Sequence, residues 1–405
     1  MALVGGVGFA LLTGVGPSLG MIGQIAYETT LSYGLSVLPL FILMGNLITQ
    51  SKLSEELYRA SNAIVGHYRG GQAMATVIAC GGFAAVCGSS IATAATMAKV
   101  AMPPMRAYGY SRSLAAGAIA AGGTLGILIP PSVIMVIYGI MTRTDIGKLF
   151  IAGIVPGIVG ILFYMGAVAW TTWRDPSAGP AAPRVGWADR LVALGGVRGV
   201  LALFALVMGG IYLGWFTPTE AAGIGAAGAF AIAILRRSLS LRGLYRVLEE
   251  TAKTTAMMFA VLIGALLFSN FVNVAGMPQA LSSFVLGQGY PPLLVLTLIL
   301  LVYVVLGCVL ESLSMILLTV PIFFPIVQQL GFDPVWFGIL VVMVTEISMI
   351  TPPIGLNVFV LRTVLPDIPT REVFRGVMPF IVADLFRLAL VTLVPWIVMV
   401  LPNMM

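Results

Sequence analysis

The sequence contains a run of 57 residues, Thr254–Leu310, without a single charged side chain. Charged residues make up 9% of the 405-residue chain, whereas soluble domains carry about 25%. A chain this apolar cannot cover a water-exposed surface. A soluble enzyme, a disordered chain and a nucleic-acid-binding protein are therefore excluded, despite the net charge of +6. A bilayer-spanning helix needs about 20 apolar residues, so this run has room for two helical elements and a connection. We expect an all-α polytopic protein of the lipid bilayer.

Basic residues gather in five groups, which the positive-inside rule places on one side of the membrane. These groups hold 18 of the 21 lysines and arginines. They are Lys52, Arg59 and Arg69; Lys99, Arg106 and Arg112; Arg174, Arg184, Arg190 and Arg198; Arg236, Arg237, Arg242, Arg246 and Lys253; and Arg362, Arg371 and Arg375. If the first two groups share one side, the chain between them must enter the membrane and return. We therefore expect a re-entrant helical hairpin over Gly70–Tyr110, with its tip near residues 88–90. Protein or a water-filled cavity must cover such a tip.

The helix-breaking residues repeat at a constant offset of 222 positions. Pro103 falls on Pro325, and the pair at 130–131 falls on the pair at 352–353. Each Pro-Pro pair removes two backbone donors and breaks a helix within the membrane. Basic loops of the first half fall on neutral loops of the second, as expected if the halves are inverted. Inverted repeats with broken helices are typical of secondary transporters. The alternative is a chance coincidence of prolines in an ordinary helical membrane protein.

The repeat predicts how the chain is divided. The expected segments are N-terminal scaffold helices with a cytoplasmic arm helix at 1–66; the first hairpin and broken helix at 67–142; scaffold helices at 143–288, including a cytoplasmic linker at 174–198 and an arm helix at 236–253; the second hairpin and broken helix at 289–362; and a C-terminal helix at 363–405. The two hairpins and the two broken helices would form the transport domain.

Each half brings a polar hairpin tip to a Pro-Pro break. A break frees backbone carbonyls, which with hydroxyl oxygens are hard ligands suited to Na⁺. It also frees amides, which suit an anionic substrate group. Intramembrane acids are functional candidates, so Glu311 and Glu346 could hold Na⁺ or carry a proton. Both acids would meet if the second tip meets the second break, whereas the alternative for each is a packing role. Helix capping for Ser89 and Ser90, and an interhelical hydrogen bond for Asn357, are likewise alternatives.

No lysine or arginine lies within 113–142 or 254–361, so we expect no fixed cation at the midplane. Bound cations and helix-end amides would then balance an anionic substrate, which favours cation symport. Asp384 and Arg387 lie three residues apart, so they can neutralise each other on one helix face. A single histidine and three cysteines without a CxxC pair indicate neither a metal cluster nor a His-based catalytic triad.

Several segments together resemble the large membrane (permease) subunit of the tripartite ATP-independent periplasmic (TRAP) transporters. The matching stretches are Gly88–Tyr110, Thr124–Ser132, Phe216–Ala222, Leu318–Pro321, Gly331–Gly338 and Glu346–Asn357. The resemblance implies a Na⁺-coupled elevator-type importer in the bacterial inner membrane, not an enzyme. It also implies two partners, a small four-helix membrane subunit and a periplasmic solute-binding protein. The implied cargo is a carboxylate, such as a C4-dicarboxylate, a sialic acid or a keto acid.

The chain departs from the family pattern in two places: Glu346 is followed by Ile-Ser rather than Leu-Gly, and Glu311 stands where the family often has Asp. The N-terminus also looks short by part of a helix. We predict one Na⁺ site at Ser89, Ser90 and Ile129 and a second at Glu311, Ser312 and Thr351. The predicted substrate ligands are Ser90, Thr93, Ser132, Ser314, Glu346 and Asn357. The alternative function is a standalone ion-coupled symporter or antiporter that needs no binding protein.

Overall fold

The computed structural model describes residues 1–51 and 53–405, so Lys52, one of the basic residues assigned to the cytoplasm, lies outside the described residues. The described chain forms 19 α-helices and four short 3-10 helices, and it contains no β-strand. The helices of the first half are α1 Ala2–Thr13, α2 Val15–Leu31, α3 Val37–Gln50, α4 Leu53–Val65, α5 Gly71–Cys87, α6 Ser90–Ala107, α7 Arg112–Thr124, α8 Val133–Thr142 and α9 Ile146–Arg174. Those of the remainder are α10 Trp187–Tyr212, α11 Pro218–Leu235, α12 Leu241–Val274, α13 Met277–Gly287, α14 Pro292–Gly307, α15 Ser312–Gln329, α16 Pro334–Ile350, α17 Leu356–Val364, α18 Thr370–Leu393 and α19 Trp396–Met399.

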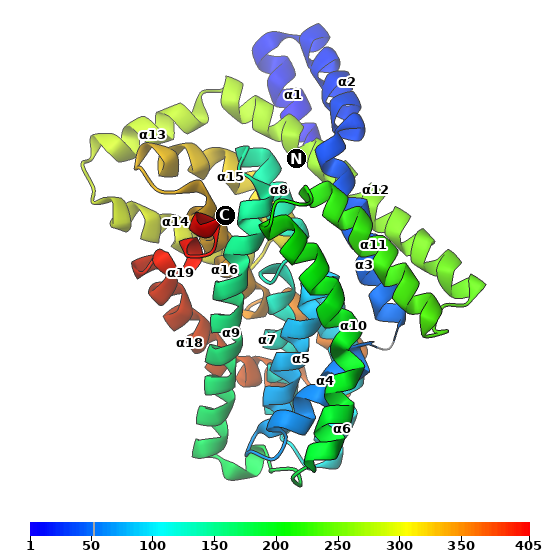
Figure 1. Cartoon of the computed structure of the whole chain (residues 1–405). Coiled ribbons are helices and arrows are strands. Elements are labelled where there is room, and N and C mark those ends of the chain that lie inside the picture. The colour runs from blue at the N-terminus through cyan, green and yellow to red at the C-terminus, as the bar shows by residue number, and fades with distance from the viewer. Residues whose placement is uncertain (52) are drawn as a thin grey trace.

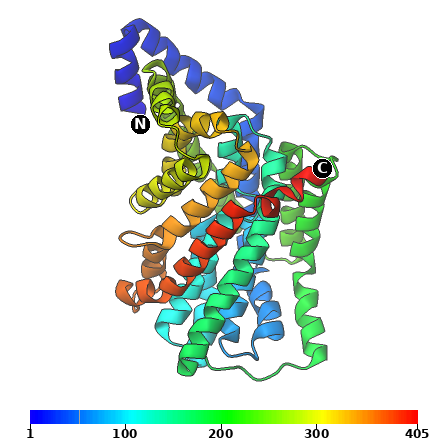
Figure 2. The same ribbon diagram turned by 90° about the vertical axis from the view of Figure 1, so that its left-hand side faces the viewer.

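Seven helical segments of the described chain are long and apolar enough to cross a membrane: Tyr33–Gln50, α9, α10, α11, α12, α15 and α18. The apolar N-terminal stretch is not one of them, because it divides into α1 and α2 at Gly14. Gly14 has a φ of 99°, which L-residues with side chains rarely adopt. The two helices project from one end of the helical body, as Figures 1 and 2 both show.

Three sequence expectations about connections need correction. The linker expected at 174–198 ends early, because α10 already begins at Trp187. The arm helix expected to begin at 236 begins at Leu241, because Arg237 turns the backbone with a φ of 52°. The arm is also not separate, since α12 continues to Val274. The uncharged run expected to hold two elements holds the end of α12 together with α13 and α14.

The helix boundaries confirm the internal repeat. Helix α6 begins and ends 222 residues before α15, and α8 ends 222 residues before α17. Both Pro-Pro bonds, at 130–131 and 352–353, are cis. The pattern continues past the breaks, because α9 corresponds to α18. Each half therefore contributes a helical hairpin, a broken helix and a long following helix.

The two hairpins are interlocked with the broken helices of the opposite half. Helix α6 of the first hairpin packs on α17, the second part of the second broken helix. The equivalent helix α15 of the second hairpin packs on α8, the second part of the first broken helix. Figure 1 shows the first hairpin in the lower part of the molecule and the second hairpin in the upper part, as an inverted repeat requires.

Candidate functional site

The first hairpin tip lies directly against the first Pro-Pro break. Gly88 ends α5 in the left-handed region, with a φ of 64°. A Cβ at this position would lie 2.5 Å from the carbonyl oxygen of Pro131, so only glycine allows this approach. A Cβ on Gly126, in the 3-10 turn before the break, would lie 2.7 Å from the carbonyl oxygen of Ser89. The tip and the break thus form one closely packed unit.

Ser90 connects this tip to the other half of the molecule. Its hydroxyl donates a hydrogen bond to Oδ1 of Asn357 over 2.9 Å, although the two residues are 267 positions apart. Nδ2 of Asn357 donates in turn to the carbonyl oxygen of Ala120 on α7, at 3.0 Å. Ser90 and Asn357 are both buried. The structure therefore brings together a tip residue of the first repeat and a break residue of the second, both predicted as substrate ligands.

Ser89 caps α6, because its hydroxyl oxygen accepts from the backbone N–H of Ala92 at 3.4 Å, whereas three other predicted hydroxyls donate to backbone carbonyls. Thr93 donates to Ser89 at 2.7 Å, and Ser132 donates to Ile127 at 2.5 Å. Thr351 donates to Ile347 at 2.6 Å. A hydroxyl that uses its proton in this way keeps its oxygen lone pairs available for another partner. These oxygens can accept from a ligand or bind a cation.

The second tip is more open than the first. Ser312 is buried, and its hydroxyl contacts the sulfur of Met349 near the end of α16, at 3.7 Å. Glu311 is exposed and caps α15, because its Oε2 accepts from the backbone N–H of Ser314 at 3.2 Å. Its role as an ion ligand remains a prediction.

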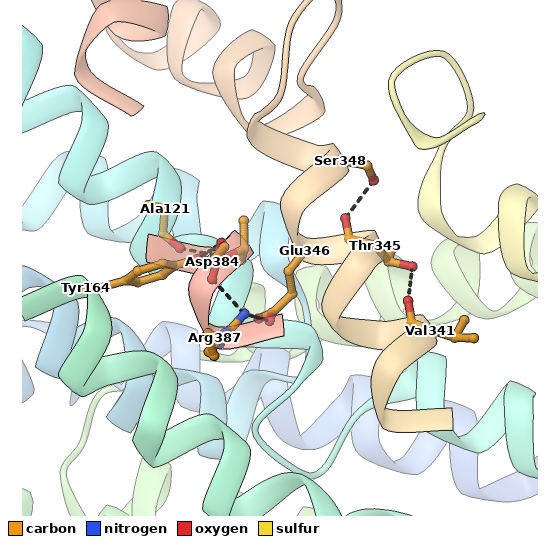
Figure 3. Close-up of polar contacts among 9 residues, drawn as sticks. Ala121, Tyr164, Val341, Thr345, Glu346, Ser348, Asp384 and Arg387 are labelled. Atoms are coloured by element: carbon orange, nitrogen blue, oxygen red, sulfur yellow. Dashed lines mark hydrogen bonds and ion pairs between the residues drawn. The ribbon is translucent and has the colours of Figure 1, made fainter. Parts of the chain in front are cut away.

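The two acids predicted to meet do not do so. Glu346 is fully buried, and the charged groups that act on it are Arg387 and Asp384. Nη2 of Arg387 lies 2.5 Å from Oε2 of Glu346 and 2.8 Å from Oδ1 of Asp384. The expectation of no fixed cation at the midplane left out Arg387, which pairs from α18 with Glu346 on α16, the helix before the second break. Figure 3 shows the three side chains converging between these helices.

A tyrosine extends this buried ion cluster, which we define as Glu346, Asp384, Arg387 and Tyr164. The hydroxyl of Tyr164, on α9, donates to Oδ2 of Asp384 at 2.5 Å and lies 3.1 Å from the hydroxyl of Thr124. All four side chains of the cluster are fully buried. The cluster thus joins α16, α18 and α9, and it reaches the end of α7 (Figure 3).

The sequence contained part of the signal for this cluster. Asp384 and Arg387 were predicted to pair, and their ion pair confirms this. The link to Glu346 was missed, although buried charges in a membrane protein usually have partners. Gly160 on α9 was also missed: a Cβ there would collide with Nη1 of Arg387. The glycines of α9 are irregularly spaced, and the sequence does not indicate which of them faces a charge.

Comparison with known proteins identifies the family. The model of the DctM component of tripartite ATP-independent periplasmic transporters matches residues 1–397. The chain belongs to this family. It is 39% identical to the C4-dicarboxylate TRAP transporter large permease protein DctM of Pseudomonas aeruginosa, covering 93% of this chain and 88% of that protein. The protein of the same name from Rhodobacter capsulatus is 37% identical over 92% of this chain and 88% of its own length.

Other relatives of this DctM-family chain have different named cargoes. The sialic acid TRAP transporter large permease SiaM of Vibrio cholerae is 32% identical, covering 92% of this chain and 87% of that protein. Among solved structures, the YdaH transporter of Alcanivorax borkumensis superposes with a TM-score of 0.64 at 16% identity, covering 94% of this chain and 88% of that one. That likeness supports the fold alone. The family and the apolar helices show a multi-pass protein of the bacterial inner membrane, a transport permease rather than an enzyme.

Proposed function

We propose that this permease subunit imports a carboxylate, of the C4-dicarboxylate type, in symport with Na⁺. The observation that carries the proposal is the buried contact between Ser90 and Asn357. This contact places the hairpin tip of the first repeat on the broken helix of the second repeat. Polar groups of both repeats therefore lie at the same site. The substrate class follows the names of the P. aeruginosa and R. capsulatus relatives.

The first proposed Na⁺ site comprises Ser89 and Ser90 with the carbonyl of Ile129. The tip and the break already lie within contact distance, as the approach of Gly88 to Pro131 shows. The second proposed site comprises Ser312, Thr351 and Glu311. Hydroxyl, carbonyl and carboxylate oxygens are the ligands that hard cations prefer.

The substrate is proposed to lie beside the first tip, near Ser90, Thr93, Ser132 and Asn357, with Ser314 approaching from the second tip. Helix α6 begins at Ser90, and α8 begins just after Ser132. Helix N-termini favour anionic groups because their N–H groups point outward and the helix dipole is positive there. Glu346 is left out of this proposal, because its carboxylate is engaged by Arg387 inside the protein.

The transport cycle is proposed to move the hairpins and broken helices together as an elevator. The buried ion cluster ties α9 and α18 to α16, so we assign these two long helices to the moving unit, which differs from the sequence expectation of α9 as a scaffold helix and α18 as a separate C-terminal helix. The remaining helices, from α1 to α4 and from α10 to α13, would form the scaffold. The proposed partners are a small four-helix membrane subunit and a periplasmic binding protein that delivers the carboxylate. A relative named DctMQ fits this picture: the chain covers only 59% of that longer protein, which leaves room for a fused partner.

Thermal unfolding of the purified protein in Na⁺ and in choline tests the Na⁺ sites. A ligand that binds only the folded state raises its stability with concentration. We expect Na⁺ to raise the melting temperature of the wild type and to do so much less for Ser90→Ala. Ser61→Ala is the matched control, because this buried serine donates to Leu57 on α4, outside both sites. Equal Na⁺ stabilisation of Ser90→Ala and the control would contradict the first site, and an unresponsive wild type would contradict both.

A further inference from the structure

The buried ion cluster has an unbalanced charge count. It contains two carboxyl groups, Glu346 and Asp384, and a single guanidinium, Arg387. All three side chains are fully buried within the protein. If both acids were ionised, the core of a membrane protein would hold one uncompensated negative charge. Such a charge is costly, because a fully buried group has lost its exposure to bulk solvent and the pairing with one guanidinium is already used.

Within the described part of the chain, the helices around the cluster supply no second cation. Of the cations in residues 1–51 and 53–405, Arg387 alone acts on Glu346 and on Asp384. Among the described residues, Tyr164 is the further titratable group at the cluster, and Asp333 caps the opposite end of α16. Tyr164 contacts Asp384, while Tyr138 on α8 donates to the carbonyl oxygen of Pro334 at the opposite end of α16. Tyr303 on α14 is buried as well.

The hydrogen bonds distinguish the two acids. Both oxygens of Asp384 face a donor group: Oδ2 accepts a hydrogen bond from Tyr164, and Oδ1 lies 2.8 Å from Nη2 of Arg387 as an ion-pair contact without hydrogen-bond geometry. An acid whose two oxygens both face donors is held as the anion. Glu346 is different, because Oε2 pairs with Arg387 while Oε1 has no partner among residues 1–51 and 53–405. Oε1 of Glu346 is therefore the position at which a proton completes the charge balance.

We propose that the buried ion cluster is a proton-binding site, with one proton held on Glu346 at neutral pH. Asp384 and Arg387 then form the ion pair, and Glu346 is a neutral acid beside it. The positive charge of Arg387, in contact with both acids, disfavours a metal cation in the same space. The cluster is electroneutral, and its proton is bound by a side chain that has no exposed surface.

The internal repeat supports a neutral group at this position. Glu346 lies 222 residues after Thr124, so the two are equivalent in the two halves. Thr124 reaches Asp384 through Tyr164, and Glu346 reaches Asp384 through Arg387. The first repeat thus presents an uncharged hydroxyl where the second presents a carboxyl group. A protonated Glu346 makes the two ends of the network alike in charge.

Infrared spectroscopy tests the proposal, because a protonated carboxyl group has a C=O stretching band that an ionised carboxylate lacks. Exposed acids are ionised at neutral pH, so they do not contribute to this band. We expect wild-type protein at neutral pH to show the band, and uniform ¹³C labelling of its glutamate to shift it. This measurement needs no substitution, so it holds even if variants of the cluster fail to fold.

Variants then assign the band to one residue. Glu346→Gln should remove the band, whereas the control Glu311→Gln should retain it, because Glu311 is exposed. A wild type without the band would overturn the proposal, including the case in which Na⁺ neutralises the cluster. A band that shifts with labelled aspartate, or that persists in Glu346→Gln, would overturn the assignment to Glu346.

Discussion

Replacing Arg387 by methionine should destabilise this permease by about 3–5 kcal/mol, the usual cost of removing one partner from a buried ion pair. The structure supports the upper part of this range, because Arg387 serves two acids and is fully buried. Methionine fills much of the same volume, so the cavity contribution is small. Asp384 would keep its hydrogen bond from Tyr164, whereas Glu346 would lose the only partner shown for it.

Denaturant or thermal unfolding of the purified protein, followed by circular dichroism, measures this loss. The matched control is Arg371→Met on the same helix, because Arg371 is exposed and its loss should change stability by less than about 0.5 kcal/mol. The deficit of Arg387→Met should shrink as the pH falls, since protonation removes the charge of Asp384, the carboxylate that loses its ion-pair partner. Adding Asp384→Asn to Arg387→Met should restore most of the stability. Equal stability of the Arg387 and Arg371 variants would refute the reasoning.

Three further predictions concern the tip, the break and the surface. Asn357→Ala leaves the buried partners of its amide unpaired, so it should cost about 1–3 kcal/mol and raise the Na⁺ concentration needed for half-maximal uptake. Gly88→Ala forces a side chain into the left-handed region and against Pro131, so it should destabilise the protein by at least about 1–3 kcal/mol and reduce uptake. A variant that unfolds and transports like the wild type would contradict the packing of the tip. Hydrogen bonds from Arg106 lower the pKa of Asp367 in the folded protein. The stabilisation from this pair is therefore present above about pH 4 and is lost as the pH falls through the lowered pKa. Asp367→Asn should remove this loss of melting temperature at acid pH.

Much of the transport core could be predicted from helix breakers alone. Proline and glycine act locally, so their spacing at 103, 130–131, 325 and 352–353 carried the repeat without any knowledge of packing. The tip at Ser89 and Ser90 followed from charge asymmetry, and the boundaries of α5 and α6 agree with it. The partnership of Ser90 with Asn357 could be expected only in outline, since it joins residues 267 positions apart.

The buried ion cluster could not be predicted in the same way. The sequence shows that Glu346 lies close to the second break, which is why it predicts a substrate ligand there. It does not show on which face of α16 the side chain lies. That face depends on how α16 packs against α18, a tertiary property that no local pattern determines. The division between α1 and α2 at Gly14 could not be predicted either, because glycine is common within the apolar runs of membrane helices.

Uptake of labelled C4-dicarboxylate into proteoliposomes tests the central claim most directly. The chain would be reconstituted with its small membrane partner, with and without an inward Na⁺ gradient and with and without the periplasmic binding protein. The account predicts accumulation only when the Na⁺ gradient and the binding protein are both present. Accumulation with Na⁺ but without the binding protein would indicate a standalone symporter. Accumulation that ignores Na⁺ and follows a proton gradient would contradict the Na⁺-coupled mechanism.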